Sequence, residues 1–105
     1  MLKKTGAAEF DSGMSRGDYV QFRDRWMKHV LGKDWLPEKH RLIAVRIALY
    51  VNFEEQFARP SVATVAIDTA SSVRTVVRAI AKLEAEGLLR IERRKRGVNR
   101  YFLIF

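Results

Sequence analysis

The chain of 105 residues contains no cysteine and only two histidines. The absence of cysteine excludes disulfide frameworks, thiolate zinc sites and cysteine nucleophiles together. His29 and His40 are isolated in the sequence and form no helical His-x-x-x-His pair, so we expect no metal site. We expect no other cofactor either.

The sequence also lacks a long apolar run. Its longest mainly apolar segment, residues 42–53, contains Arg46 and Asn52 and is too short to span a bilayer. No apolar stretch follows Lys3 and Lys4, so the start of the chain does not resemble a signal peptide. We therefore expect a soluble cytoplasmic protein without a membrane partner.

The motifs of common enzyme classes are missing as well. The sequence has no glycine-rich phosphate loop and no nucleophile elbow. Glu54 and Glu55 are more typical of a solvated helix end than of a general acid–base pair. We expect a protein that is not an enzyme, and a compact basic ribonuclease toxin is the enzymatic alternative.

What the sequence does have is positive charge, and the charge is unevenly distributed. Twenty Lys and Arg against twelve Asp and Glu give a net charge of +8. Residues 1–58 contribute +2 and residues 59–105 contribute +6. Since 48% of the residues are hydrophobic, the chain can still build a core. The excess indicates a polyanionic partner, with nucleic acid favoured over an acidic membrane or an acidic protein.

The beginning of the chain predicts an arm and an extension. Residues 1–18 are rich in Gly, Ser, Ala and charge, which is typical of a flexible arm. Within an N-terminal extension at 19–36, residues 19–22 favour a short strand. Residues 23–30 favour a short helix, which Gly32 would end.

The next segment predicts the buried centre of the domain. Residues 37–56 are apolar nearly all round, which indicates a buried helix with Pro37 in its first turn. Pro60 disfavours helical backbone just before it and ends this segment. We expect Trp26 and Trp35 to pack into the core, and a dimer surface or a base-stacking platform is the alternative.

Two helices joined by a tight turn follow, which is the helix-turn-helix order. Ser61 is an N-cap candidate for a short helix at 62–69, and residues 70–71 form the turn. Ser72 is the N-cap candidate for a longer helix at 73–86. The apolar stripe of that helix consists of Val73, Val76, Ile80 and Leu83.

A basic β-hairpin is predicted at the end of the chain. Gly87 ends the longer helix, and residues 88–93 and 100–105 are two apolar, β-prone runs. The segment between them, 94–99, is basic and contains Gly97. The sequence therefore predicts a mainly α fold with a small β-hairpin, an α+β arrangement.

Short segments after residue 59 also carry a resemblance to a known family. They are Pro60-Ser61, Val65-Ala66, Ser72-Val73-Arg74-Thr75-Val76, Ala79-Ile80, Leu83-Glu84, Glu86-Gly87-Leu88-Leu89 and Asn99-Arg100-Tyr101. Through them, residues 60–105 resemble the winged helix-turn-helix module of phage and plasmid replication initiators and related bacterial regulators. Three positions depart from the family pattern: Val65 replaces the usual Leu, Ala70 the turn glycine and Ser71 an apolar residue. A left-handed Ala70 would cost about 1 kcal/mol.

The resemblance implies one winged helix-turn-helix domain over residues 19–105. Its helix-turn-helix would occupy 61–87 and its β wing 88–105. Residues 73–83 would be the recognition helix, which enters the major groove. The candidate DNA-binding residues are Ser72, Arg74, Thr75, Val77, Arg78 and Lys82 on the helix and Arg93, Arg94, Lys95, Arg96 and Arg100 on the hairpin.

The predicted partner is double-stranded DNA. The resemblance implies a phage- or plasmid-type transcriptional regulator or replication factor, which would be nucleoid-associated through DNA. Homodimerisation on paired half-sites is compatible with this function. The alternative function is a protein-interaction adapter of the winged-helix type.

Overall fold

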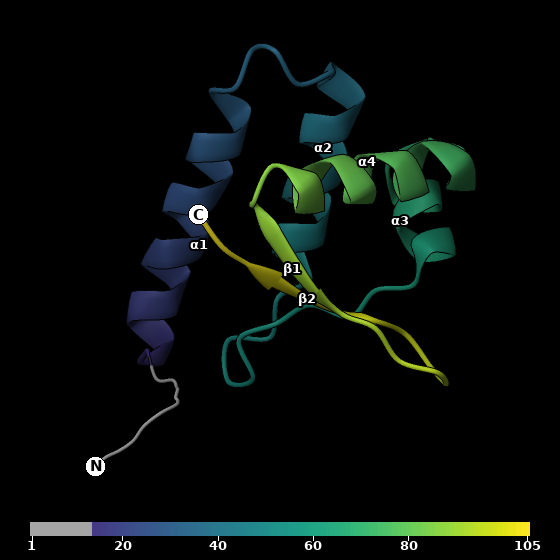
Figure 1. Cartoon of the computed structure of the whole chain (residues 1–105). Helices are drawn as coiled ribbons and strands as arrows, with labels where there is room; N and C mark the ends of the chain where they lie inside the picture. Colours follow the sequence, from purple (N-terminus) through teal and green to yellow (C-terminus); the bar gives the residue numbers. More distant parts are fainter. Residues whose placement is uncertain (1–13) are drawn as a thin grey trace.

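Four helices followed by a small antiparallel hairpin make up the computed structural model, which describes residues 14–105 (Figure 1). The helices are α1 (Arg16–Leu31), α2 (Glu38–Leu49), α3 (Val62–Asp68) and α4 (Val73–Ala85), and the strands are β1 (Leu89–Glu92) and β2 (Arg100–Leu103). The prediction of a mainly α fold with a β-hairpin is confirmed. Residues 1–13 of the expected arm lie outside the described part of the chain.

Helix α1 corrects the prediction of a strand at 19–22 followed by a short helix at 23–30. One continuous helix begins at Arg16, inside the expected arm, because Ser15 caps it by accepting from the backbone N–H of Asp18 at 3.1 Å. The buried residues Tyr19, Trp26 and Val30 are its inner face. Their helical spacing makes a helix, not a strand, the conformation that buries all three together.

The two tryptophans differ in environment. Trp26 is fully buried, as predicted, and its Nε1–H is shared between the carbonyls of Leu88 at 3.0 Å and Ile104 at 2.8 Å. Trp35, in contrast, lies in the connection after α1 and is 52% exposed, so the prediction that it packs into the core is wrong. The ammonium nitrogens of Lys33 and Lys82 lie 5.7 and 5.6 Å from the centre of its ring, a cation–π arrangement at the surface.

Helix α2 is shorter and less buried than predicted. It ends at Leu49 instead of continuing to residue 56, because the Asn52 side chain accepts from the N–H groups of Glu54 and Glu55 at 2.8 and 2.9 Å. Such a side-chain turn competes with helical hydrogen bonding. Only one side of α2 is in the core, since Leu42 and Leu49 are each 48% exposed.

The predicted caps around the turn are confirmed. Ser61 accepts from the Thr64 N–H at 3.1 Å, and Ser72 accepts from the Thr75 N–H at 3.0 Å. Gly87, just beyond the end of α4, has φ +75°, the left-handed conformation that ends many helices. The stripe of α4 differs at two positions, because Val73 is exposed and Ala79 is buried together with Val76, Ile80 and Leu83.

Strands β1 and β2 pair antiparallel with Leu89 opposite Leu103 and Glu92 opposite Arg100. Outside the named strands, Ala58 forms an isolated antiparallel bridge with Tyr101, with N···O distances of 2.9 and 2.8 Å. The segment before α3 therefore lines the free edge of β2. The β runs begin and end close to the predicted residues.

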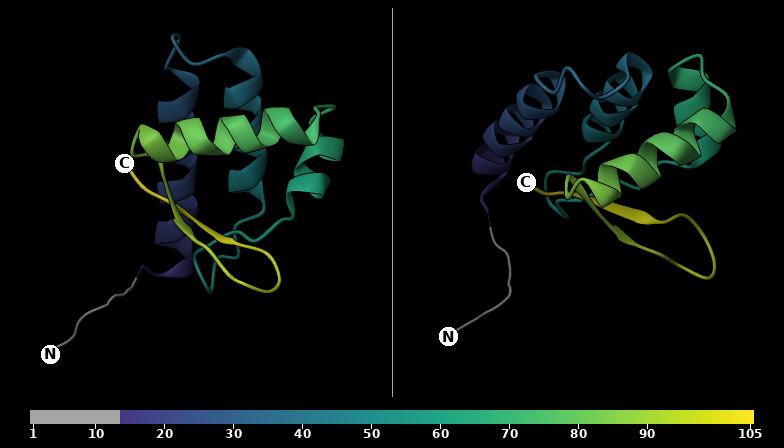
Figure 2. Two further views of the ribbon diagram at one scale, coloured as in Figure 1. Left: turned by 45° about the vertical axis from the view of Figure 1, so that its right-hand side comes forward. Right: turned by 45° about the horizontal axis from the view of Figure 1, so that its top comes forward.

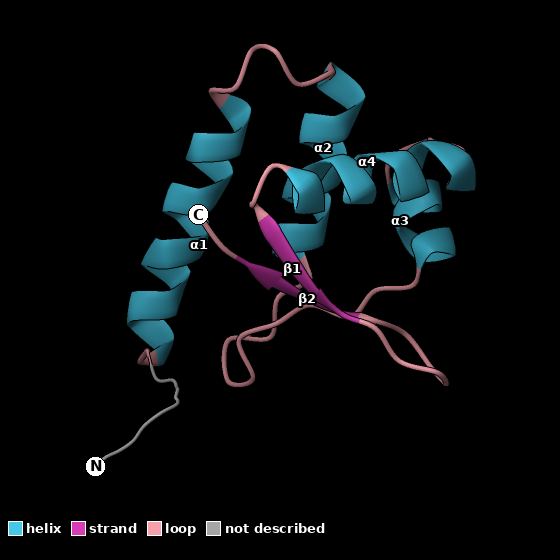
Figure 3. Cartoon of the chain, in the orientation of Figure 1, coloured by secondary structure: helices cyan, strands magenta, loops and turns pink. Residues whose placement is uncertain are grey.

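The elements are arranged around one core. Helices α1 and α2 run in opposite directions, and α4 packs across α2 (Figures 1 and 2). Helix α3 packs against α4 and α2, while the hairpin follows α4 and extends its connecting loop away from the helices (Figure 3). None of the helices described in residues 14–105 has the length and apolar character needed to cross a membrane.

The buried indole of Trp26 leads to a stability prediction. Trp26→Phe removes the N–H that donates to the Leu88 and Ile104 carbonyls and leaves a small cavity, so we expect a loss of about 2–4 kcal/mol in the free energy of unfolding. Urea denaturation measures this loss. The exposed Trp35→Phe serves as the control and should change the free energy of unfolding by less than about 0.5 kcal/mol. Equal effects of the two substitutions would contradict the role of Trp26.

Candidate nucleic-acid interface

Helix α4 presents a charged outer side because its other side is in the core. With Val76, Ala79, Ile80 and Leu83 buried, the helical repeat places Arg74 and Arg78 one turn apart on the exposed side. Val77 lies beside them and is 51% exposed. The next outward positions are the small, exposed residues Ala81 and Ala85, and Val77 and Ala81 line a hollow with Ile91 and Arg93 of the hairpin.

Ser72 and Thr75, the two predicted DNA-binding residues with hydroxyl groups, are hydrogen-bonded to each other at the start of α4. Ser72 Oγ accepts from the Thr75 N–H and donates to Thr75 Oγ1 at 2.9 Å. Ser72 is exposed and Thr75 is half-buried, so Ser72 is the more accessible of the pair. Both side chains fix the start of the helix, which sets the direction of Arg74.

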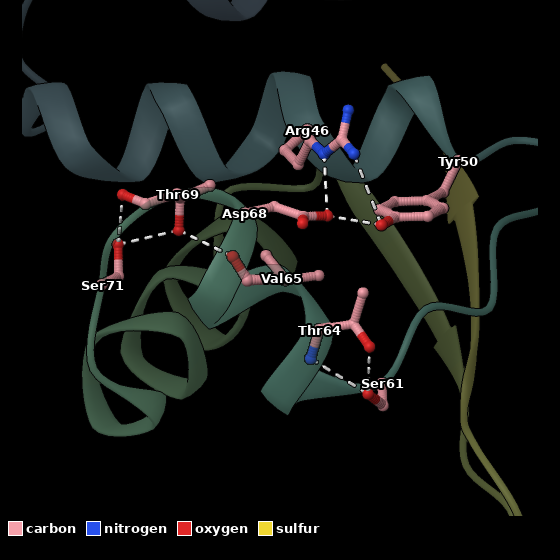
Figure 4. A network of polar contacts seen from close by, with 8 residues as sticks. All are labelled: Arg46, Tyr50, Ser61, Thr64, Val65, Asp68, Thr69 and Ser71. Atoms are coloured by element: carbon pink, nitrogen blue, oxygen red, sulfur yellow. Dashed lines mark hydrogen bonds and ion pairs between the residues drawn. The ribbon is translucent and has the colours of Figure 1, made fainter.

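The turn before α4 is strained and held by side chains. Ala70 has φ +52°, a left-handed conformation that costs a residue with a Cβ about 1 kcal/mol. Lys39 of α2 donates to the Thr69 carbonyl at 3.0 Å, and Thr69 Oγ1 donates to the Val65 carbonyl at 2.8 Å. Thr69 and Ser71 are also joined through their side-chain oxygens, which lie 2.8 Å apart. Figure 4 draws this contact as a dashed line. These contacts offset the strain at Ala70.

A second polar network joins α2 to α3. Arg46 Nε donates to the Asp68 carboxylate at 3.0 Å, and the Tyr50 hydroxyl donates to the same oxygen (Figure 4). The hydrogen bond from Tyr50, and then that from Arg46, lowers the pKa of Asp68. The network therefore fixes the position of α3, and with it the turn that leads into α4.

The hairpin is clamped to α4 by an ion pair. Both terminal nitrogens of Arg93 donate to the two oxygens of Glu84, each at 3.0 Å. This two-point geometry fixes orientation as well as distance. The hydrogen bonds from Arg93 lower the pKa of Glu84. Arg93 is thus a positioning residue for the hairpin, with its charge already matched.

Two other predicted cations also have acidic partners. Arg100 lies 3.1 Å from Glu92 across the hairpin. Lys82 lies 3.1 Å from Glu86, one turn further along α4, and near the ring of Trp35. Lys82 therefore follows Arg78 by one turn on α4, but its charge is already matched by Glu86.

The remaining predicted cations are exposed and form no ion pair with any residue in 14–105. They fall into two groups. One is the pair on the outer side of α4, and the other is in the loop of the hairpin. They are Arg74 and Arg78 on the helix and Arg94, Lys95 and Arg96 on the loop.

Arg59 and Arg90 are basic residues outside the predicted DNA-binding set. Arg59 lines a hollow of about 370 Å³ together with three hairpin arginines, Arg94, Arg96 and Arg100. Arg90 lies over the ring of Phe102 with its guanidinium carbon 3.9 Å from the ring centre. The sequence carries no local signal for the position of Arg59, since that position depends on the long-range pairing of Ala58 with Tyr101.

The histidines lie outside these basic surfaces. Burial, and then the nearby Lys82, lowers the pKa of His40, while His29 packs on Phe105 with ring centres 5.1 Å apart. Within residues 14–105 no three His, Asp or Glu side chains gather in a way that could hold a metal ion. Comparisons of the chain with protein-family models, curated proteins and solved structures give no match.

The clamp between Arg93 and Glu84 leads to a pH prediction. Because the folded pKa of Glu84 lies below its ordinary value of 4.5, the ion pair stabilises the fold above that value. The stabilisation is lost as the pH falls through the lowered pKa. We expect Glu84→Gln to have a lower urea midpoint than the unmodified protein at neutral pH, and the two midpoints to converge in acid.

Glu55→Gln is the matched control for this experiment. Glu55 is exposed and forms no ion pair with the residues in 14–105, so its substitution should give a midpoint difference that does not change with pH. If the difference in urea midpoint between Glu84→Gln and the unmodified protein persists unchanged in acid, the carboxylate does not stabilise the hairpin.

Proposed function

We propose that the protein binds double-stranded DNA as a winged helix-turn-helix module. In this proposal α3 and α4 are the two helices of the motif, α4 is the recognition helix, and the hairpin is the wing. The element order, the capped turn before α4 and the basic hairpin loop support the assignment. The biological role proposed is that of a phage- or plasmid-type transcriptional regulator or replication factor.

The observation that carries the proposal is the placement of Arg74 and Arg78. They lie one turn apart on the exposed side of a helix whose opposite side is buried. An α-helix fits the major groove, which is about 12 Å wide, and arginine donates two hydrogen bonds to a guanine edge. Val77 beside them can contact a thymine methyl group. The core fixes α4, so these side chains approach a duplex from a rigid base.

The cations of the hairpin serve a different purpose in this proposal. Arg94, Lys95 and Arg96 are exposed on a loop and form no ion pair within residues 14–105. Contacts from such groups to phosphates give affinity without base preference. Roughly six phosphate contacts from helix and hairpin together correspond to a salt slope of about −5.

Two sets of substitutions separate these roles. We expect Arg78→Ala to relax the preference at one base pair, at a cost of about 1–3 kcal/mol. The double substitution Lys95→Gln and Arg96→Gln should weaken binding to all duplexes alike and reduce the salt slope by about two. Selection of bound duplexes from a random pool measures the first effect, and fluorescence anisotropy across salt concentrations measures the second.

Lys28→Gln is the control for the loss of charge alone, because Lys28 is exposed on α1 and forms no ion pair with residues 14–105. This variant should bind duplexes almost as the unmodified protein does. Unchanged duplex binding by both the Arg78 and the Lys95/Arg96 variants would exclude the proposed interface.

Protein–protein interaction is a second candidate function, favoured by an exposed apolar hollow of about 290 Å³ beside α1 and α2. Leu31, Leu42 and Val45 line it, and Glu38 and Arg41 are at the same hollow. In a symmetric dimer formed through this hollow, Leu31 and Leu42 would be buried, and Glu38 of one copy could pair with Arg41 of the other. We then expect the sedimentation mass to rise with concentration and Leu42→Asp to abolish the rise. A monomeric mass at every concentration contradicts this function.

A further inference from the structure

The face of the hairpin turned away from the core is a second basic surface. Side chains alternate along a strand, and Leu89, Tyr101 and Leu103 are buried. Their neighbours therefore point to the opposite face. The residues of this outer face are Arg90 and Glu92 of β1 and Arg100 and Phe102 of β2.

The segment before α3 extends this outer face. Ala58 is fully buried and pairs with Tyr101, so its neighbours Phe57 and Arg59 are on the outer side with Arg100 and Phe102. Two contacts agree with this placement. The rings of Phe57 and Phe102 are 5.4 Å apart, and the Arg100 guanidinium carbon lies 5.0 Å from the centre of the Phe57 ring.

Four arginines line one hollow on this side. Arg59, Arg94, Arg96 and Arg100 line a space of about 370 Å³, which we name the arginine hollow. Within residues 14–105, only Arg100 among the four has a carboxylate partner, Glu92 at 3.1 Å. The other three form no ion pair with the described residues. Like charges gathered in this way repel one another until an anion joins them.

The chemistry of the hollow selects a phosphate group. Guanidinium groups donate paired hydrogen bonds to phosphate oxygens, and arginine is the preferred residue for this two-point recognition. The apolar lining is limited to Val98 and the glycine beside it, Gly97, so few side chains would favour an apolar ligand instead.

We propose that the arginine hollow binds a backbone phosphate of nucleic acid on the side of the hairpin opposite to α4. The choice of polymer rests on the proposed DNA-binding function, whereas the phosphate chemistry rests on the four arginines. Since α4 packs on the core side of β1, the bound phosphate does not belong to the base pairs that Arg74 and Arg78 read. It comes from the flank of the same duplex or from a second duplex.

Arg59 provides the test, because it is exposed and lies outside both α4 and the hairpin. We expect Arg59→Gln to weaken duplex binding about five- to tenfold at 0.1 M salt and to reduce the salt slope by about 0.9, without changing the preferred sequence. Arg59→Lys keeps the charge but loses the forked donor, and should bind with intermediate affinity. Arg25→Gln, an exposed arginine of α1, is the control and should leave affinity unchanged.

Duplex length distinguishes the two sources of phosphate. If the phosphate comes from the flank of the same duplex, Arg59→Gln weakens binding only to a duplex that extends beyond the bases selected by α4. If it comes from a second duplex, Arg59→Gln also affects a short duplex, because the protein then loses a second bound copy of it. Either result supports the hollow. An Arg59→Gln variant that matches Arg25→Gln on both duplexes overturns it.

Titration with inorganic pyrophosphate separates this inference from the proposed function. We expect pyrophosphate to shift the arginine Nε–H signals in the NMR spectrum of the unmodified protein and to shift them far less in Arg59→Gln. If pyrophosphate does so while no duplex binds, the phosphate site stands and the DNA-binding function fails. Shifts that are absent, or equal in the two proteins, overturn the site.

Discussion

The contact of the Trp26 indole with the base of the hairpin positions both basic surfaces, the outer side of α4 and the outer face of the hairpin. Its single N–H reaches the carbonyls of Leu88 and Ile104, so α1 is joined to the first and last residues of the hairpin base. Ile104 N also donates to the Leu88 carbonyl at 3.1 Å, which closes that base. Because Leu88 directly follows the left-handed Gly87 at the end of α4, the same contact determines where the hairpin leaves the helix.

Acidic residues then determine which cations remain available. Glu84, Glu86 and Glu92 pair with Arg93, Lys82 and Arg100, and all six side chains are partly or fully exposed. Such pairs contribute little to stability, but they hold long side chains in one orientation. The predicted cations without an acidic partner in residues 14–105 are thereby left on the outer side of α4 and on the hairpin loop, whose Arg94 and Arg96 line the arginine hollow with Arg59.

The sequence was sufficient to predict those helix ends that depend on interactions within a few residues. Ser61, Ser72 and Gly87 mark helix ends through hydrogen bonds and backbone conformation within a few residues, and all three predictions hold. The predictions failed where two local signals compete. Ser15 capped α1 inside a segment that resembled an arm, and the Asn52 side chain ended α2 within an apolar run. Trp35 was expected in the core because aromatic residues usually are, yet it is half exposed and lies beside the ammonium groups of Lys33 and Lys82.

The sequence by itself determined the helices around the tight turn, the basic hairpin and the concentration of charge after residue 58. Each depends on neighbours in the chain, through caps, periodicity or composition. Only the tertiary structure decided that Arg93 holds the hairpin to α4 and that Arg59 lies with Arg94, Arg96 and Arg100. The reason is physical: these positions follow from the pairing of Ala58 with Tyr101 and from the packing of α4, and both join residues that the sequence alone does not bring together.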